Sequence, residues 1–394
     1  EPLDSTYMDS LTRLMDAAER VQKVRDVIGE YEDGMMRRER RFDIDGLSLL
    51  VRGALSTSRD RRMRGLQLPE ASRSADVADY ALALSPLAAT WGLRVAGVES
   101  RSKMPRMVLS NSLALGLTYG ITSALKSSTD VVRPNGADNH SMPSRHAAIA
   151  FASATILHRE YGHLSPWVSV GGYATATATE YLRLHHHAHW VSDLYMGAGI
   201  GMVSTNFAYF LADRLLRGNT YNRPRLTIDD FNRTVIYNTR PSGITLTAGT
   251  EWGSEQKVKS SSMFTAGVEW SEFVDSRWAV EAMFRMANTY YSVGESTTMD
   301  ELNIYHLDLG AKRSFLIDPS VRFSLRGYAG GRYMEHMPSL TDAQVHPEVG
   351  AGLSIDYMQH EHYVMGVSCD YNHTFSHWFR SRWIVNMSWK VLIW

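Results

Sequence analysis

From residue 243 to the end of the chain, apolar and polar residues alternate with a period of two in about eight successive segments. Alternation of this kind indicates β-strands that have one apolar and one polar face. In the first segment, Ile244, Leu246 and Ala248 share the apolar face. The opposite faces hold acidic and basic residues of mixed sign, for example Glu251 and Arg326. The pattern predicts eight antiparallel strands in residues 243–394.

Aromatic residues mark the ends of these apolar faces, as at Trp252, Trp270, Trp278, Tyr357, Tyr363 and Trp383. An apolar band between aromatic girdles is typical of a barrel whose outer wall faces lipid. Eight strands close a barrel too narrow for a channel, so its inward charges must pair with one another. The pattern therefore predicts an eight-stranded antiparallel transmembrane β-barrel that resembles those of bacterial outer membranes. A soluble sandwich or lipocalin-like barrel is the alternative, since a soluble sheet also alternates.

Residues 5–220 have a different pattern and read as helical. Within them, Met107–Leu125 and Leu194–Ala212 carry no charged residue. Each stretch is long enough to cross a bilayer, although a buried helix in a soluble bundle would look the same. A polar connector follows. We therefore expect a helical domain in residues 1–220, a linker in residues 221–242 and the barrel in residues 243–394.

Composition narrows the possible functions. The 41 basic and 42 acidic residues nearly cancel, so the chain lacks the basic excess of a nucleic-acid-binding protein. Cys369 is the single cysteine, which excludes an internal disulfide framework. The first residues, Glu1 to Asp4, are polar and lack an initiator Met, so we expect a mature or trimmed form rather than a chain with a signal peptide.

Three short blocks in the helical half combine the residue types that phosphate chemistry needs. They read Lys126-x6-Arg133-Pro134, Pro143-Ser144-Arg145-His146 and Arg183-x5-His189-x3-Asp193. Lys126, Arg133 and Arg183 are fixed cations for a phosphate dianion. His146 and His189 are two imidazoles that can divide the roles of acid and nucleophile. Asp193 follows His189 by one helical turn, so its carboxylate can hold that ring.

The spacing of these blocks resembles the signature of the type 2 phosphatidic acid phosphatase superfamily, which also contains bacterial class A acid phosphatases and vanadium haloperoxidases. That signature reads K-x6-RP, PSGH and SR-x5-H-x3-D. Arg145 stands where the family has glycine, and Leu182 stands where it has serine. The resemblance covers roughly residues 75–215, and it implies that the helical domain is an all-α bundle of the phosphatidic acid phosphatase type.

The resemblance also implies a role for each matching residue. His189 attacks phosphorus and becomes a phosphohistidine, Asp193 fixes its tautomer, and His146 protonates the leaving oxygen and then activates water. The phosphate oxygens are held by Lys126, Arg133, Ser144 and Arg183, with Arg145 as a further cation near the site. The family needs no metal and no other cofactor. The neighbouring run His185-His186-His187 is then expected to form pocket wall or surface, with adventitious metal binding as the alternative.

These observations favour a metal-independent phosphatase that hydrolyses a phosphomonoester, with a phosphorylated lipid as the expected substrate because the barrel holds the site close to membrane lipid. The alternatives are a broad-specificity periplasmic acid phosphatase that acts on small phosphate esters, a vanadate-dependent haloperoxidase, and a non-catalytic outer-membrane lipid-binding protein. Nucleic acid is not an expected partner.

The two halves together predict a location. One chain is unlikely to insert a helix bundle in the inner membrane and a barrel in the outer membrane. We therefore expect the barrel to lie in the bacterial outer membrane and the helical phosphatase domain to lie in the periplasm. On this prediction, both uncharged stretches, Met107–Leu125 and Leu194–Ala212, are buried core helices.

Overall fold

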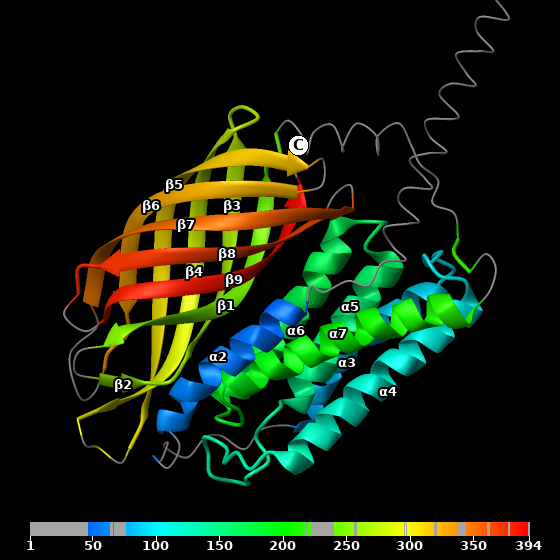
Figure 1. The fold of residues 1–394 in the computed structure, drawn as a ribbon, viewed down its shortest axis with the longest axis horizontal. Helices are drawn as coiled ribbons and strands as arrows, with labels where there is room; N and C mark the ends of the chain where they lie inside the picture. Colours follow the sequence, from blue (N-terminus) through cyan, green and yellow to red (C-terminus); the bar gives the residue numbers. More distant parts are fainter. Residues whose placement is uncertain are drawn as a thin grey trace, which may run out of the picture.

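The structure is a computed structural model, and it describes residues 46–63, 66, 76–216, 220–222, 240–255, 258–294, 296, 298–318, 321–337, 344–360, 363–376 and 379–392. Within these residues an all-α region precedes an all-β region (Figure 1). The helices are α2 (Leu47–Met63), α3 (Asp76–Val95), α4 (Met104–Ser128), α5 (Arg145–Tyr161), α6 (Pro166–His185) and α7 (Val191–Leu215). The predicted all-α bundle is confirmed.

Helix α5 forms the centre of the bundle and packs against α3, α4, α6 and α7. Its first turn is capped by Ser144, whose side chain accepts a hydrogen bond from the backbone N–H of Ala147. Helix α7 approaches α5 closely because two of its contact positions are glycines. A Cβ at Gly197 would lie 2.3 Å from the carbonyl oxygen of Ser144, and a Cβ at Gly201 would lie 2.2 Å from that of Ala148.

The strands are β1 (Gly243–Glu255), β2 (Val258–Ser260), β3 (Met263–Phe273), β4 (Trp278–Val293), β5 (Asp300–Asp318), β6 (Val321–Met334), β7 (Gln344–His360), β8 (Tyr363–Thr374) and β9 (Phe379–Leu392). They form one antiparallel sheet in the order β2-β4-β3-β1-β9-β8-β7-β6-β5, and β4 also pairs with β5. That pairing closes all strands except the short β2 into a barrel. The predicted eight-stranded antiparallel barrel is confirmed.

The barrel interior holds the charged residues that the alternating pattern placed there. Arg326 donates hydrogen bonds to Asp370 at 2.6 and 2.5 Å and to Glu269 at 3.0 Å. Arg382 donates to Glu251 at 3.0 Å. The outer wall exposes large apolar side chains, among them Trp270, Phe284, Leu307, Leu309, Leu325, Leu353, Ile355 and Trp383. A wall of this kind is suited to lipid rather than water, which matches the outer-membrane class of barrel.

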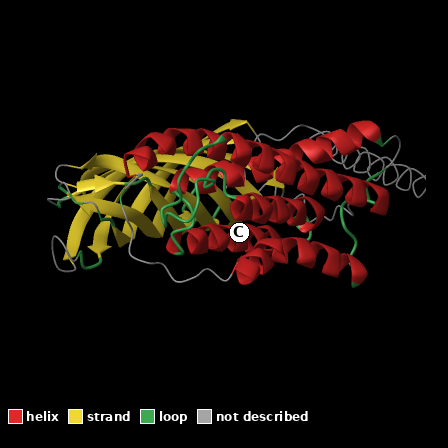
Figure 2. Cartoon of the chain, turned by 90° about the horizontal axis from the view of Figure 1, so that it is seen from below, coloured by secondary structure: helices red, strands yellow, loops and turns green. Residues whose placement is uncertain are grey.

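The helical region lies along one side of the barrel and covers part of its outer wall (Figures 1 and 2). Tyr173 of α6 stacks on Trp389 of β9 with ring centroids 4.9 Å apart, and Tyr195 of α7 stacks on Phe264 of β3 at 6.1 Å. These residues belong to one apolar cluster that spans helices and strands. The two regions therefore share a core instead of being joined by the connector alone.

Polar contacts fix the register of this interface. Arg52 of α2 donates to the backbone oxygen of Ala248 at 3.2 Å. The buried carboxylate of Asp60 accepts the backbone N–H of Ser192 at 2.8 Å and that of Ser262 at 2.9 Å. One side chain of α2 thus holds both the start of α7 and the edge of the barrel.

The two uncharged stretches have different surroundings. Leu194–Ala212 lies in α7 and is mostly buried, as predicted. The prediction of a buried core helix is wrong for Met107–Leu125, because α4 packs through one narrow face and only 28% of its most apolar window is buried. Among the described helices, α4 is the one long and apolar enough to cross a bilayer.

The glycine contact between α5 and α7 is testable. Gly197→Ala should cost about 1–3 kcal/mol of unfolding free energy, because the added methyl group meets the backbone of Ser144 and α7 must move away. Urea unfolding in detergent, followed by helical circular dichroism, measures this change. Gly92→Ala on α3 is the matched control: no atom lies within 4 Å of its added Cβ, and the substitution should leave stability unchanged or raise it. Equal effects of the two variants would contradict the packing argument.

Candidate active site

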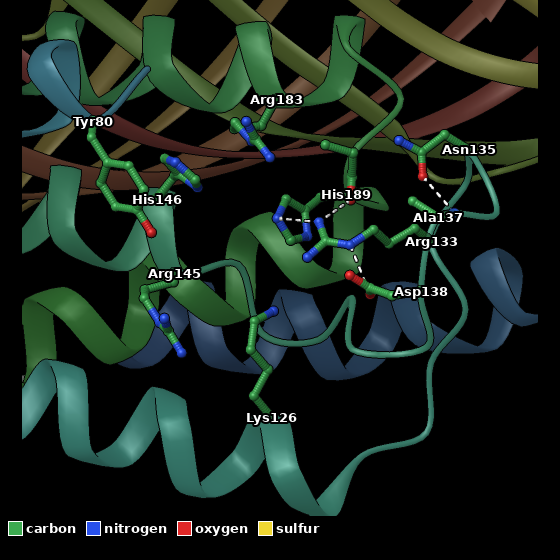
Figure 3. Close-up of a pocket in the computed structure, with 11 residues that line it drawn as sticks. Tyr80, Lys126, Arg133, Asn135, Ala137, Asp138, Arg145, His146, Arg183 and His189 are labelled. Carbon is green, nitrogen blue, oxygen red and sulfur yellow. Dashed lines mark hydrogen bonds and ion pairs between the residues drawn. The ribbon is translucent and has the colours of Figure 1, made fainter. Parts of the chain in front are cut away.

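A pocket of about 340 Å³ lies where the ends of several helices meet (Figure 3). It is lined by Tyr80, Lys126, Arg133, Asn135, Ala137, Asp138, Arg145, His146, Arg183, Ala188 and His189. The lining therefore includes residues from all three sequence blocks, which α4, α5, α6 and their connecting loops bring together. Ser144 and Asp193, the other two predicted site residues, lie behind this lining and are fully buried.

His189 is buried between a cation and a carboxylate. Its Nε2 lies 3.2 Å from a terminal nitrogen of Arg133, and its Nδ1 lies 3.4 Å from the hydroxyl of Ser141. The carboxylate of Asp193 lies 3.8 Å from Nδ1 and accepts the Ser141 hydroxyl at 2.5 Å. A proton on Nδ1 is therefore favoured by the carboxylate side, which leaves the Nε2 lone pair directed toward the cations.

The electrostatic environment keeps this imidazole neutral. Burial is the main cause that holds the pKa of His189 well below its usual value of 6.5, and the cations Arg133, Lys126 and Arg183 lower it further. A neutral ring retains the lone pair that a nucleophile needs. The same cations would attract a phosphate dianion to the ring.

Each of the three cations is held by a separate partner. The ammonium of Lys126 donates to backbone oxygens, including that of Pro143 at 3.1 Å. Arg133 forms an ion pair with Asp138 at 2.8 Å. Arg183 donates to the buried carboxylate of Asp79 at 2.7 Å. The positive groups are thus oriented before any anion arrives, which is the arrangement that stabilises developing negative charge.

The second imidazole lies in the first turn of α5, where the helix N-terminus also favours an anion. His146 is buried, and the ring of Tyr80 packs on it with centroids 3.8 Å apart and planes tilted by 36°. Both rings line the same pocket as His189 (Figure 3). The stack limits the orientations of the His146 ring.

The blocks PSRH and R-x5-H-x3-D are joined directly. The backbone N–H of Ser144 donates to the backbone oxygen of Asp193 at 2.9 Å. The Ser144 hydroxyl accepts the N–H of Ala147 at 3.4 Å as the cap of α5. Its assignment as a phosphate ligand stays a prediction.

Arg145 and Leu182 are the two departures from the family signature. The guanidinium of Arg145 lies 4.9 Å above the ring of Tyr119 and within 3.4 Å of the Ser123 hydroxyl, both on α4. The extra cation therefore sits on the α4 side of the pocket rather than on the imidazoles. Leu182 is half-buried on α6.

The histidine run lies at the junction with the barrel. His185 and His187 approach the carboxylate of Glu301 on β5 at 3.6 and 3.5 Å, whereas His186 approaches Asp79 at 3.4 Å. His187 adopts a left-handed backbone conformation with φ of 51°. His185 and His187 thus share one carboxylate and His186 approaches another, so the run lies at the junction of the helices with the barrel and outside the pocket lining.

Potential metal ligands cluster elsewhere in the described residues. His306, Asp308 and Glu348 lie inside the barrel with their ligand atoms within 4.8 Å of one another. Asp308 accepts a hydrogen bond from Arg285 at 2.5 Å, and His306 is 2.8 Å from Glu348. These side chains therefore form a charge network inside the barrel. The pocket near His189 is a separate place, and its positive charge comes from arginine and lysine.

Sequence reasoning missed four neighbours of the predicted site: Asp79, Tyr80, Asp138 and Ser141. Asp79 and Tyr80 precede the first signature block, and nothing in the linear sequence connects Asp79 with Arg183, 104 positions later. Asp138 and Ser141 lie between signature blocks in a segment without a motif. Only the folded chain brings these side chains to the pocket.

Comparisons with known proteins find similar sequences for the helical region. Residues 108–217 match the family model of the PAP2 superfamily. A segment of 182 residues is 36% identical to lipid A 1-phosphatase of Porphyromonas gingivalis, a match that covers 46% of this chain and 41% of that protein. The chain therefore spans less than half the length of this curated relative.

Similar solved structures correspond to the barrel. Neisserial surface protein A has a TM-score of 0.32 and 10% identity, covering 39% of this chain and 99% of that protein. The barrel domain of Pseudomonas aeruginosa OprF has a TM-score of 0.27 and 12% identity, covering 40% of this chain and 98% of that domain. The outer membrane enzyme PagL has a TM-score of 0.26 and 12% identity, covering 38% of this chain and 99% of that enzyme.

The lowered pKa of His189 predicts an unusual pH dependence. The imidazole of His189 should stay neutral as the pH falls below 6.5. Protonation of His189 should therefore not lower kcat/KM for a small phosphate ester near pH 6.5. Arg133→Gln removes one cause of the lowered pKa, so protonation of the ring should begin at a higher pH. The measurement is the pH profile of kcat/KM for both proteins.

The control for this profile is Arg61→Gln on α2, which is exposed and outside the pocket. Its acid limb should coincide with that of the unmodified chain. An acid limb that stays in place in Arg133→Gln would show that Arg133 does not influence the titration of His189.

Proposed function

We propose that this chain, whose helical half contains a PAP2 superfamily domain, is a phosphatase that hydrolyses a phosphomonoester through a phosphohistidine at His189. One observation carries the proposal: three separate sequence blocks converge on one pocket that contains two imidazoles and a set of oriented cations. The relative named lipid A 1-phosphatase adds support for phosphatase chemistry.

Substrate binding begins with charge. Lys126, Arg133 and Arg183 surround the pocket and would hold the oxygens of a phosphate dianion. One terminal nitrogen of Arg133 donates to the backbone oxygen of Ala188 and lies 3.2 Å from Nε2 of His189, so the guanidinium is held beside the imidazole, where its other terminal nitrogen can contact the phosphate. This places phosphorus in front of the nucleophilic nitrogen.

In the first step, the lone pair on Nε2 of His189 forms a P–N bond while the bond from phosphorus to the leaving oxygen breaks. The leaving oxygen takes a proton from His146, which must therefore begin as the imidazolium. The proton on Nδ1 of His189 stays in place, and the positive charge that develops on its ring is offset by Asp193.

In the second step, His146, now neutral, takes a proton from water as that water attacks phosphorus. The P–N bond breaks, its electron pair returns to Nε2, and inorganic phosphate leaves. Both imidazoles are then in their starting states. Every proton transfer is carried by residues of this pocket, and Ser141 links the nucleophile to Asp193 throughout.

We propose a phosphorylated lipid as the substrate, of the lipid A type that the name of the relative suggests. The barrel outer wall would keep the pocket in contact with membrane lipid, which raises the local concentration of such a substrate. A small soluble phosphate ester fits the same chemistry, and comparison of the two substrates separates a lipid phosphatase from a broad-specificity acid phosphatase.

We propose the bacterial outer membrane as the location, because of the class of the barrel. For the helical half, the sequence analysis predicts the periplasm. One structural feature favours the opposite side: His187, next to the pocket residue Ala188, approaches Glu301 at the end of the barrel where the sequence between consecutive strands is longer, as between β4 and β5 and between β6 and β7. In outer-membrane barrels, the longer connections are extracellular and the short turns are periplasmic.

The covalent intermediate is the central test. His189→Ala should lower kcat for 4-nitrophenyl phosphate to background, because the nucleophile is lost. His146→Ala should instead release a burst of one nitrophenolate per active site, since this leaving group needs little acid help, and then stall because water is not activated. The phosphoenzyme should be labile in acid and stable in alkali, as expected for a P–N bond.

Asp138→Asn provides a matched control, because it changes the partner of one cation and leaves both imidazoles unaltered. It should retain turnover at a reduced rate and show no burst. Unchanged turnover in His189→Ala would falsify the proposed mechanism.

The side of the membrane can be tested with one cysteine. Ala137 is exposed at the pocket edge, so Ala137→Cys in a Cys369→Ser background provides a single label site. A membrane-impermeant maleimide should label intact cells if the pocket faces outward. Labelling that requires permeabilised outer membranes would instead support the predicted periplasmic location.

A further inference from the structure

The segment between α6 and α7 carries the proposed nucleophile. We define the nucleophile loop as residues 184–190, which lead from the last turn of α6 to the start of α7 and include His189. Arg183 comes directly before it. The loop turns at His187, whose φ of 51° lies in the left-handed region that a residue with a Cβ disfavours. A conformation of this kind persists only where neighbouring groups hold it, so the contacts of the loop determine where His189 lies.

One side chain of the barrel contacts this loop at its start, middle and end. Tyr290 of β4 is fully buried. Its hydroxyl donates a hydrogen bond to the backbone oxygen of Leu184. Its ring meets the ring of His187 with centroids 5.4 Å apart and planes at 79°, and that of Trp190 at 6.2 Å and 85°. The loop therefore packs around one tyrosine that belongs to the other half of the chain.

Trp190 connects this contact with the pocket. It is buried, and its indole N–H donates to the backbone oxygen of Val132, directly before Arg133, at 2.8 Å. Its backbone N–H donates to the carboxylate of Asp193 at 2.9 Å. A shift of Trp190 would thus move the loop relative to both the cation and the carboxylate that flank His189.

Tyr290 is fixed from both sides within the barrel. Its backbone N–H donates to the hydroxyl of Ser261 at 3.1 Å, and its backbone oxygen accepts the N–H of Ser261 at 2.8 Å. On the other side it pairs with Glu301 of β5 in antiparallel register. Glu301 also reaches the loop, with its carboxylate 3.5 Å from Nε2 of His187. Two paired strands of the barrel thus present neighbouring side chains to the same loop.

This support comes from outside the PAP2 domain. The family model matches residues 108–217, which include the whole nucleophile loop but no barrel strand. The start of α7, just after the loop, is held in addition by Asp60, which bonds to Ser192 and Ser262. The matched domain therefore contains the proposed reacting groups, whereas the barrel supplies part of what holds them in place.

We propose that Tyr290 is a positioning residue for His189, so that the pocket is fully competent only with the barrel packed against the helices. The inference rests on the proposed phosphatase function for the role of His189, but not for the support of the loop. Tyr290 does not line the pocket, so it acts through the loop and not on the substrate. An in-line attack needs close alignment of nitrogen and phosphorus, so a small displacement of the loop slows the reaction while the cations still bind phosphate.

The first experiment removes only the Tyr290 hydroxyl. Tyr290→Phe keeps the ring, and it should lower kcat for 4-nitrophenyl phosphate roughly tenfold, the scale of one lost hydrogen bond. KM and the inhibition constant of inorganic phosphate should stay within about twofold, because Lys126, Arg133 and Arg183 keep their own partners. A general loosening of the pocket would instead weaken phosphate binding together with kcat.

In the His146→Ala background, the nitrophenolate burst reports the attack by His189 alone. Adding Tyr290→Phe should slow that burst by a similar factor and leave its amplitude at one per active site. Tyr291→Phe is the matched control. Tyr291 follows on the same strand and is also fully buried, but it belongs to a separate apolar cluster that contains Met334. This substitution should change neither kcat nor the burst.

The second experiment measures the loop without catalysis. Amide hydrogen exchange of the full chain in detergent should be faster in residues 184–190 of Tyr290→Phe than in the unmodified chain, since the loop opens more often. Exchange in α5 should be unchanged, which shows that the bundle stays folded. Tyr291→Phe should exchange like the unmodified chain in both segments.

The results separate the two ideas. Faster loop exchange in a chain that forms no phosphoenzyme contradicts the phosphatase function, and only the support of the loop by the barrel remains. Unchanged loop exchange in Tyr290→Phe overturns the proposal, and so does a normal kcat despite faster exchange. Equal losses of activity in Tyr290→Phe and Tyr291→Phe, or a weaker binding of phosphate that matches the loss of kcat, would assign Tyr290 a general structural role and reject positioning.

Discussion

The concentration of positive charge around one buried imidazole is the constraint on which the site depends. Arg133, Lys126 and Arg183 would repel one another if they were not each fixed by a separate partner. Burial together with their combined field lowers the pKa of His189 and keeps the ring neutral, as the proposed nucleophile must be, and the same field would attract a phosphate dianion. Binding and activation therefore come from the same charges.

That cluster depends in turn on close backbone contacts. Gly197 lets α7 approach the start of α5, and the backbone of Ser144 bonds to that of Asp193, so two of the three sequence blocks are held in one unit. Asp60 ties the start of α7 to the barrel. The barrel is therefore part of the support of the site.

Apolar surface has two roles in this molecule. Where the helices meet the barrel, aromatic pairs such as Tyr173 and Trp389 bury it and join the two regions. On the uncovered barrel wall and on α4, apolar surface stays exposed, and such exposure is less costly in lipid than in water. The same physical effect thus joins the two regions and leaves a barrel wall that is suited to lipid.

The sequence by itself determined the eight barrel strands, because the pleat of a strand has a period of two and one polar face must be enclosed. It also identified six residues that line the pocket, because their chemistry depends on residue type and short-range spacing: Lys126, Arg133, Arg145, His146, Arg183 and His189. Asp79, Tyr80 and Ser141 were found only in the tertiary structure, since they reach the pocket from positions that have no local motif. The exposure of α4 was decided there as well: an uncharged helix has the same sequence pattern whether protein or lipid surrounds it, and only its packing partners distinguish the two.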